Sequence, residues 1–412
     1  MNLKKLYIIF SIPVFLWSQN LNELLDLSLK NQLVNSYEYN LDSVKKEYES
    51  VKSGYLPSFD VSGKYGIADK ETASLAKKSG NISGSLNYKL YDGGKKFDIY
   101  DSYKSTIKST KKSVEALKND ISLTVINHYF NYLSLVSQKD AKLKEIEQLN
   151  SQMKRLSRFL NAGTTTEDEV QKIISRVENA KVNLQEIELE IITILHKLEY
   201  ITGSKVNITA GSAIEELTKV SEDVRRFDIE ALEYDLQTKL SNSKAEKSAY
   251  LPTIILDNTY SYYDSDFNNK AYESNAIDHQ NILSINLQWN IFSFGETKNK
   301  YESKYKEYLA SKSNYEYEKN KANVDLQLAQ KAYRIAKAKI KSAKANLKAA
   351  QSAYEVIKSK YENGLIDNVA YLESLSEKFE AISQLKTSIN DLEIKKANII
   401  YQSGEKLEEY IK

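Results

Sequence analysis

The chain has 412 residues, and its 58 basic and 56 acidic side chains leave a formal net charge of +2. This balance argues against a nucleic-acid partner, because a phosphate-binding surface needs an excess of basic residues on one face. The sequence contains no cysteine, which excludes disulfide bonds, thiolate metal sites and a lipid-acceptor cysteine. We therefore expect any membrane attachment to come from the fold itself.

Residues 1–19 are expected to form a secretory signal peptide. Basic Lys4 and Lys5 precede an apolar run from Leu6 to Trp17, and polar residues follow. The run is too short to span a bilayer as a helix. Because no later segment has 18 apolar residues in a row, a mature chain that crosses a membrane would have to do so as a β-barrel.

The rest of the chain is predicted to be an internal duplication, with a first repeat at 20–210 and a second at 211–412. The matching landmarks are Tyr-Leu-Pro at 55–57 and 250–252, and two glycine pairs that are each 69 positions apart, Gly94 with Gly163 and Gly295 with Gly364. Equal spacings of this length are hard to obtain by chance. The two halves should therefore share one structural plan.

Each repeat is expected to start with a helix that ends at its Tyr-Leu-Pro, because the residue before proline is disfavoured in the α region. Apolar and polar residues then alternate with the period of a strand that has two different faces. We expect strands at 57–67, 81–92, 252–263 and 281–292. Strands of about ten residues are long enough to cross a bilayer when they are tilted.

A long helix should follow the strands in each repeat, since no Pro or Gly interrupts the chain between the paired glycines. At 1.5 Å per residue, each helix would be a rod of roughly 100 Å. Beyond the first pair, apolar residues step by three and four, as in a coiled-coil seam: Val170, Ile173, Val177, Ala180, Leu184, Ile187, Ile191, Ile194, Leu198 and Ile201. Each repeat is therefore predicted to contain a helical hairpin that turns at Gly163 or Gly364.

This duplicated order of elements resembles the TolC-like outer-membrane efflux protein family. The resemblance is carried by the Tyr-Leu-Pro segments, the strand-end glycines and the hairpin-tip glycines, and it covers nearly the whole mature chain. It implies an α+β membrane protein, in which a trimeric 12-stranded β-barrel with four strands per protomer continues into a long α-helical coiled-coil barrel. The implied function is that of an outer-membrane exit duct.

Such a duct passively conducts substrates from an inner-membrane transporter through the periplasm of a Gram-negative bacterium to the exterior. The implied partners are two further copies of the chain, a periplasmic adaptor protein, the transporter and outer-membrane lipid. The need to close the sheet into a barrel independently supports assembly of several copies, because an open sheet edge in lipid leaves backbone groups unpaired. Two copies would give eight strands with a nearly filled interior, whereas three would leave a lumen.

The resemblance also implies a periplasmic aperture held shut by polar bonds between helices. Glu169 and Tyr361 match the positions of an acidic residue and an aperture tyrosine, so a hydrogen bond between them is the candidate latch. The aperture arginine of the family corresponds to Ile366 here. Of two constricting carboxylates, only Glu373 is acidic, because the other position is Ala370. As an alternative, Glu169 and Glu373 are ordinary solvated residues, since glutamate is common on helix surfaces.

The hairpin tips are the expected contacts with the adaptor: Gly163, Thr164, Gly364 and Leu365. No catalytic, cofactor or metal site is expected. The three histidines, His128, His196 and His279, lie far apart in the sequence, and no His-Glu-x-x-His pattern occurs.

Two other classes of protein share some of these features. A periplasmic adaptor would show one hairpin among compact β domains, whereas this chain duplicates every element. A soluble coiled-coil scaffold is favoured by the heptads but disfavoured by the signal peptide and the four strands. The sequence leaves the transported substrate open among drugs, metals and proteins.

Overall fold

The computed structural model describes residues 18–217, 225–273 and 277–412. The expected signal peptide therefore lies almost entirely outside the described residues. Two compact units divide the chain. The sheet unit contains Tyr37–Val114 and Phe227–Lys319, and the hairpin unit contains the residues up to Ser36, Glu115–Arg226 and Asn320–Lys412. The long helices α3 and α7 contribute to both units.

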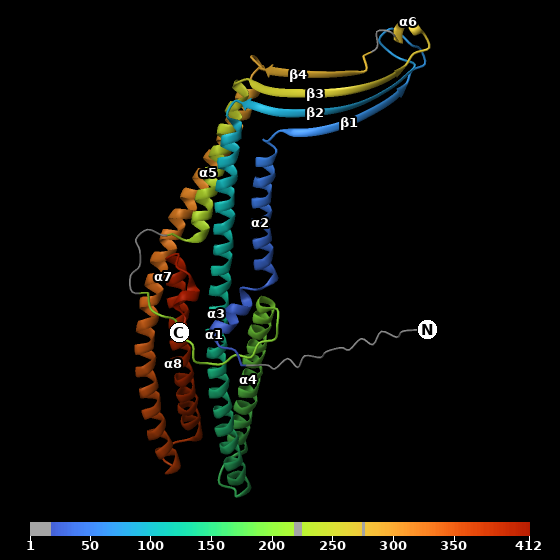
Figure 1. Cartoon of the computed structure of the whole chain (residues 1–412). Coiled ribbons are helices and arrows are strands. Elements are labelled where there is room, and N and C mark those ends of the chain that lie inside the picture. The colour runs from blue at the N-terminus through green and yellow to red at the C-terminus, as the bar shows by residue number, and fades with distance from the viewer. Residues whose placement is uncertain (1–17, 218–224, 274–276) are drawn as a thin grey trace, which may run out of the picture. The chain divides into compact units, whose positions relative to one another are not determined.

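The described elements follow each other in two similar series (Figure 1). The first consists of α1 (Leu21–Ser28), α2 (Gln32–Ser53), β1 (Ser58–Ile67), β2 (Lys78–Asp92), α3 (Lys95–Asn161) and α4 (Glu167–Thr202). The second consists of α5 (Phe227–Glu246), η1 (Lys247–Tyr250), β3 (Thr253–Asp266), α6 (Lys270–Glu273), β4 (His279–Gln288), α7 (Glu296–Glu362), α8 (Asn368–Gln402) and η2 (Leu407–Tyr410). Helices α3 and α7 both have 67 residues.

The sheet unit is built on four antiparallel strands in the order β1-β2-β3-β4, so β1 and β4 are its two edges (Figure 1). Strand pairing aligns Phe59 with Leu86, Leu86 with Asn258, and Asn258 with Leu283. Because successive side chains point to opposite faces, this register gathers the alternating apolar residues on one face of the sheet.

Strand β4 ends at Gln288, four residues before the end of the expected strand 281–292. The reason is the partner strand, whose first paired residue, Thr253, faces Gln288. The residue before it is Pro252, which has no N–H to continue the ladder. The expected helix 21–53 is likewise interrupted, since α1 ends at Ser28 and α2 begins at Gln32.

The hairpin unit consists of two helical hairpins, α3–α4 and α7–α8, that lie side by side (Figure 1). Both tips use the same backbone geometry. Gly163 and Gly364 have φ of 71°, which only glycine adopts without strain. The amides of Gly163 and Thr164 donate to Leu160 and Phe159, and the second tip repeats this pair of bonds, so both helices end in a Schellman motif.

Two hydrophobic clusters hold the hairpin unit together. One joins α1, α3 and the chain ends, where Tyr129 and Phe130 are fully buried. The other lies toward the tips and combines residues of all four long helices, including Ile173 of α4 and Leu375 of α8. Four residues of the α4 seam predicted from the heptads are buried in this second cluster: Val170, Ile173, Val177 and Ala180.

The chain ends and the segment between the repeats also pack in this unit. The backbone of Gln19 pairs with Asn207 and Thr209, and Ile214 pairs with Ile411 near the C-terminus. Gln19, the last residue of the expected signal peptide, therefore belongs to the folded part of the chain. Among the described residues, none of the helices combines the length and the apolar character that a membrane-spanning helix requires.

Candidate functional site

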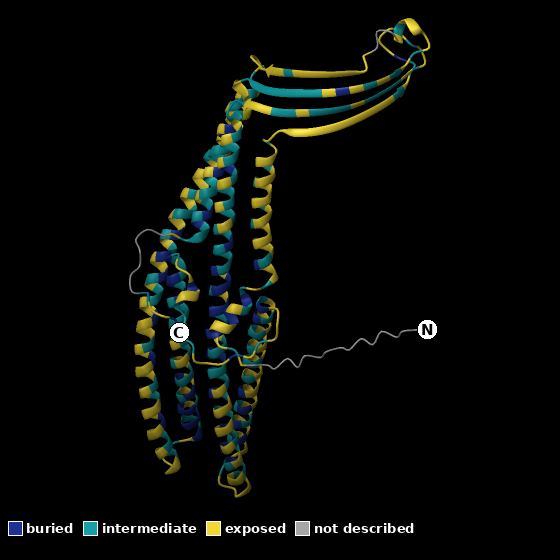
Figure 2. Ribbon diagram, in the orientation of Figure 1, coloured by how far each residue is buried: buried dark blue, intermediate teal, exposed yellow. Residues whose placement is uncertain are grey.

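The first functional feature is the apolar face of the sheet. Its exposed members are Phe59, Val61, Tyr65 and Ile67 of β1, Ile82 and Leu86 of β2, Tyr260 and Tyr262 of β3, and Leu283, Ile285 and Leu287 of β4. Figure 2 shows both edge strands almost wholly exposed. Soluble monomers rarely expose a contiguous apolar patch of this kind, so the face requires a covering that one protomer does not supply.

The opposite face of the sheet is polar and internally hydrogen-bonded. The hydroxyls of Ser83 and Ser261 lie 2.8 Å apart, and the Asn286 side-chain amide donates to Asp257 at 2.6 Å. One apolar and one polar face on tilted strands is the pattern of a wall between lipid and water. The strands thus supply both surfaces that a membrane channel needs.

The second feature is a polar contact between the two hairpins near their tips. Gln152 of α3 is 6% exposed, and its Nε2 donates to the Tyr361 hydroxyl of α7 and to Asn368 Oδ1 of α8, the latter at 2.9 Å. The Arg155 guanidinium lies 5.2 Å from the centre of the Tyr361 ring, whose other neighbour is the stacked ring of Tyr371 at 4.8 Å. Three helices therefore meet at one buried amide.

Burial is the main cause of the altered acidity at this contact. It raises the pKa of Tyr361, against the opposing effects of Arg155 and Gln152. The tyrosine is therefore a neutral hydroxyl at physiological pH. Asn368 is 7% exposed, and its Nδ2 finds no acceptor within the described chain. A buried amide without a partner costs free energy, so Asn368 Nδ2 is an unsatisfied donor beside this contact.

Within the protomer, Glu169 and Tyr361 each bond to a different residue instead of forming the hydrogen bond expected between them. Glu169 pairs with Lys172 on its own helix at 3.0 Å, while Tyr361 bonds to Gln152. Glu169 still lies close enough to contribute to the raised pKa of Tyr361. The two residues are neighbours, but their connection runs through different side chains.

The remaining predicted site residues lie at or near the tips. Glu373 of α8 is an exposed carboxylate 3.8 Å from the Arg176 guanidinium of α4, a second link between the hairpins. Gly163, Thr164 and Gly364 form the turns, and the Leu365 side chain is 72% exposed. These positions are accessible to a partner that approaches the hairpin ends.

Gln152 and Asn368 were missed by the sequence reasoning, although one signal was present. Gln152 stands between Leu149 and Leu156 at steps of three and four, so it is a polar residue inside an apolar seam. A single polar residue in such a seam often fixes which helices pair and in what register. Nothing comparable marks Asn368, which is simply the first residue of α8.

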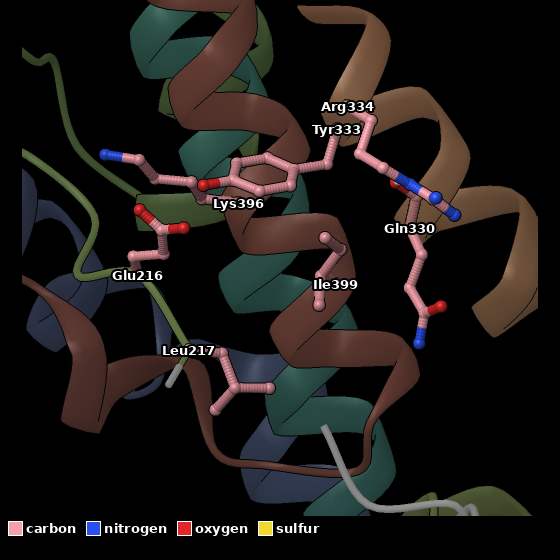
Figure 3. A pocket seen from close by; sticks show the side chains of 7 residues that line it. All are labelled: Glu216, Leu217, Gln330, Tyr333, Arg334, Lys396 and Ile399. Carbon is pink, nitrogen blue, oxygen red and sulfur yellow. Dashed lines mark hydrogen bonds between the residues drawn. The ribbon is translucent and has the colours of Figure 1, made fainter. Parts of the chain in front are cut away.

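A cavity of about 350 Å³ lies elsewhere in the hairpin unit, against α7 and α8. Figure 3 shows the Tyr333 hydroxyl directed toward Glu216 and Lys396, with Arg334 and Gln330 on the other side. Two of its charged groups are already paired, because Glu216 binds Lys337 at 2.8 Å and Lys396 binds Glu393 at 2.7 Å. The Arg334 Nε donates to the Gln330 carbonyl oxygen at 3.4 Å. Among the described residues, no group of His, Asp and Glu is arranged to hold a metal ion.

Comparison with known proteins agrees with these features. The sequence model of the family described as outer membrane efflux protein matches residues 24–204 and 221–399. No curated protein sequence matches the chain.

Among solved structures, the Campylobacter jejuni CmeC outer membrane channel is 19% identical at a TM-score of 0.83, with 93% of this chain and 85% of that chain covered. VceC of Vibrio cholerae is 14% identical at a TM-score of 0.81, with 94% and 96% covered. The open state of the Neisseria gonorrhoeae MtrE channel is 14% identical at a TM-score of 0.74, with 94% and 89% covered.

The fold and the two features define a protomer of an outer-membrane channel. The family match extends over most of both repeats, and the chain belongs to the outer membrane efflux protein family. It is an outer-membrane efflux component that reaches into the periplasm, and it is not an adaptor. This outcome confirms the predicted function, localisation and protomer fold, whereas the trimeric barrel stays a prediction.

Proposed function

We propose that three copies of this chain form one passive exit duct in the outer membrane, closed at the periplasmic end by the Gln152 contact. The observation that carries the proposal is the four-stranded sheet with one exposed apolar face and two open edges. Such a sheet cannot seal itself in lipid, because each unpaired edge group there costs several kcal/mol. Three copies supply twelve strands, enough for a barrel with a lumen.

The hairpin unit supports ring assembly by a separate route. Its helices lie in the order α7-α8-α3-α4, as contacts between α8 and α3 show, so α4 and α7 are its edges (Figure 1). Both edges expose apolar residues at heptad-like steps: Val182, Leu189 and Ile192 on α4, and Val324, Leu328 and Ile335 on α7. We expect α4 of one copy to pack against α7 of the next, which closes the helical wall as well.

The contact between the hairpins acts as the gate in this proposal. Gln152, Tyr361 and Asn368 hold α3, α7 and α8 together, and Arg176 with Glu373 adds a weaker exposed link. Opening requires the two hairpins of a protomer to separate at their tips. An adaptor that binds the tips more tightly in the separated arrangement would shift this equilibrium without any chemical step.

The exposed hairpin tips support the partners that we propose. A periplasmic adaptor is proposed to bind the tips around Gly163, Thr164, Gly364 and Leu365, and an inner-membrane transporter to deliver the substrate. The duct itself conducts passively and performs no catalysis. Substrate selection then belongs to the transporter.

Cysteine cross-linking tests the assembly directly, because the chain has no cysteine of its own. Val61→Cys on β1 is combined in turn with Leu283→Cys, Ile285→Cys or Leu287→Cys on β4, and membranes are oxidised. At least one pair should give covalent dimers and trimers on non-reducing gels. Val61→Cys alone and Val61→Cys with Leu256→Cys on the inner strand β3 are the controls. Membrane-embedded protein without any three-chain product would refute the ring.

A further inference from the structure

The turn between β4 and α7 has an unusual backbone. The Glu296 amide donates to Ser293 O at 2.9 Å, and the two residues between them, Phe294 and Gly295, have φ of 49° and 90°. A turn with positive φ at both central residues normally carries Asn, Asp or Gly first. In the described part of the chain, Phe294 is the only residue other than glycine with positive φ.

The first repeat builds the corresponding turn with glycine. Between β2 and α3, Gly93 and Gly94 have φ of 73° and 84°. A Cβ atom at Gly93 would lie 2.5 Å from the Ser248 carbonyl oxygen, so glycine is required there. The second repeat keeps the same backbone but places a phenylalanine in it. Strain retained at one position indicates that its side chain has a use.

Within the protomer, the Phe294 side chain makes few contacts that could offset this strain. It is 91% exposed, and its ring partner is Phe292, itself 71% exposed, at 4.6 Å between centroids. Two exposed phenylalanine rings at a strained turn are unfavourable in water. The compensation must therefore come from outside the protomer.

The position of the turn identifies that outside partner. Trp289 and Ile291 continue the alternating apolar row of β4 beyond its last paired residue, Gln288, and both are exposed. The Trp289 indole N–H donates to Tyr250 O at 3.1 Å. Aromatic residues at the ends of lipid-facing strands lie at the boundary between hydrocarbon and headgroups. Phe292 and Phe294 follow this row directly in the chain, at the same end of the sheet.

We propose that Phe292 and Phe294 form an aromatic wedge that inserts into the interfacial layer of the lipid membrane at the α7 end of the sheet. The wedge fixes the depth of the channel in the bilayer, and the strained turn orients it. This inference rests on the proposed function, because only a sheet embedded in lipid places a membrane surface beside the turn.

Depth-dependent fluorescence quenching tests the wedge. In a Trp289→Phe background, the residues after the expected signal peptide contain no tryptophan, so Phe294→Trp introduces a single reporter. The trimer is reconstituted in phosphatidylcholine vesicles brominated either near the carbonyl end or near the methyl end of the acyl chains. We expect blue-shifted emission that bromine near the carbonyl end quenches more strongly. Aqueous iodide should have little effect.

Two matched reporters separate the wedge from the proposed function. Leu283→Trp, near the middle of β4, should be quenched by bromine deeper in the chains, and Tyr39→Trp on α2 should respond to no brominated lipid. The wedge is wrong, and the membrane sheet stands, if the Leu283→Trp reporter is quenched while the Phe294→Trp reporter responds only to iodide, or to neither quencher because a second copy covers it. If brominated lipid does not quench the Leu283→Trp reporter, the proposed function itself fails.

A second variant checks the role of the strain. Phe294→Gly recreates the glycine turn of the first repeat, so it should fold. In detergent, where no bilayer surface lies beside the turn, the substitution should raise the thermal unfolding temperature because it removes the backbone strain. In vesicles it should lower this temperature relative to the original chain, because the contact of Phe294 with lipid is lost. A shift of the same sign in both media would overturn the assignment.

Discussion

The side-chain amide of Gln152 on α3 donates to the Oδ1 atom of Asn368 on α8 at 2.9 Å, and both side chains are buried. The same amide bonds to the Tyr361 hydroxyl on α7. One residue of the first hairpin thereby engages both helices of the second. Among the described residues, no backbone hydrogen bond joins the two hairpins near their tips. The Gln152 contact can therefore be broken without unfolding either hairpin.

Replacing Gln152 should therefore weaken the closed state. In Gln152→Ala, loss of a buried hydrogen-bonded amide removes about 1–3 kcal/mol, which shifts the open–closed equilibrium by about 5- to 150-fold. Ion conductance of the reconstituted trimer in planar bilayers should rise accordingly. Gln148→Ala on the exposed side of the same helix is the matched control. Equal conductance of the two variants would remove Gln152 from the gate.

Replacing Glu169 should have a smaller effect than replacing Gln152. The Glu169 carboxylate pairs with Lys172 near the surface, and surface ion pairs contribute about 0–1 kcal/mol. The same conductance measurement on Glu169→Ala tests this order. A rise as large as that of Gln152→Ala would restore Glu169 as a latch residue, through a bond that forms only in the assembled duct.

The charge of Glu373 should govern block by divalent cations at the mouth. In the proposed trimer, three symmetry copies of this carboxylate would concentrate negative potential there, and Arg176 at 3.8 Å would partly offset each one. Glu373→Ala should weaken block by divalent cations in bilayer recordings, and Arg176→Ala should strengthen it. Glu380→Ala, an exposed glutamate farther along α8, serves as the control. Identical block curves for all variants would place Glu373 away from the pore.

Stability should fall on mild acidification because of His128. Burial, and to a smaller extent Lys197, lowers its pKa below 6.5. Below pH 6.5 the unfolded chain takes up the proton before the folded chain does, so the free energy of unfolding decreases as pH falls through 6.5 toward the folded pKa. His128→Gln should lose this part of the pH dependence in thermal unfolding of the detergent-solubilised protein. An unchanged profile would contradict the assignment.

The sequence predicted the repeat plan because the decisive signals are local. Proline at 57 and 252, the glycines at the tips and the period of two in the strands act on neighbouring residues. The end of β4 was placed too late because it depends on Pro252 of the partner strand, which the β4 sequence does not contain. The break between α1 and α2 was missed because no proline or glycine marks it.

The site was less predictable than the fold for a physical reason. Tyr361 lies close to the tip glycine Gly364 in the sequence, but the choice of its hydrogen-bond partner depends on how four helices pack. Gln152 and Asn368 are 216 positions apart, and only the tertiary structure brings them together. Apolar residues in a seam can be read from their spacing, whereas hydrogen-bond partners across hairpins cannot.

Four strands per chain are too few to close in lipid, so we propose that three chains share one barrel. Native mass spectrometry of the full-length mature protein, released from lipid nanodiscs, counts the copies directly. We expect a mass of three chains that persists in mild detergent. A single chain in each nanodisc, or a water-soluble monomer that never enters the bilayer, would contradict it.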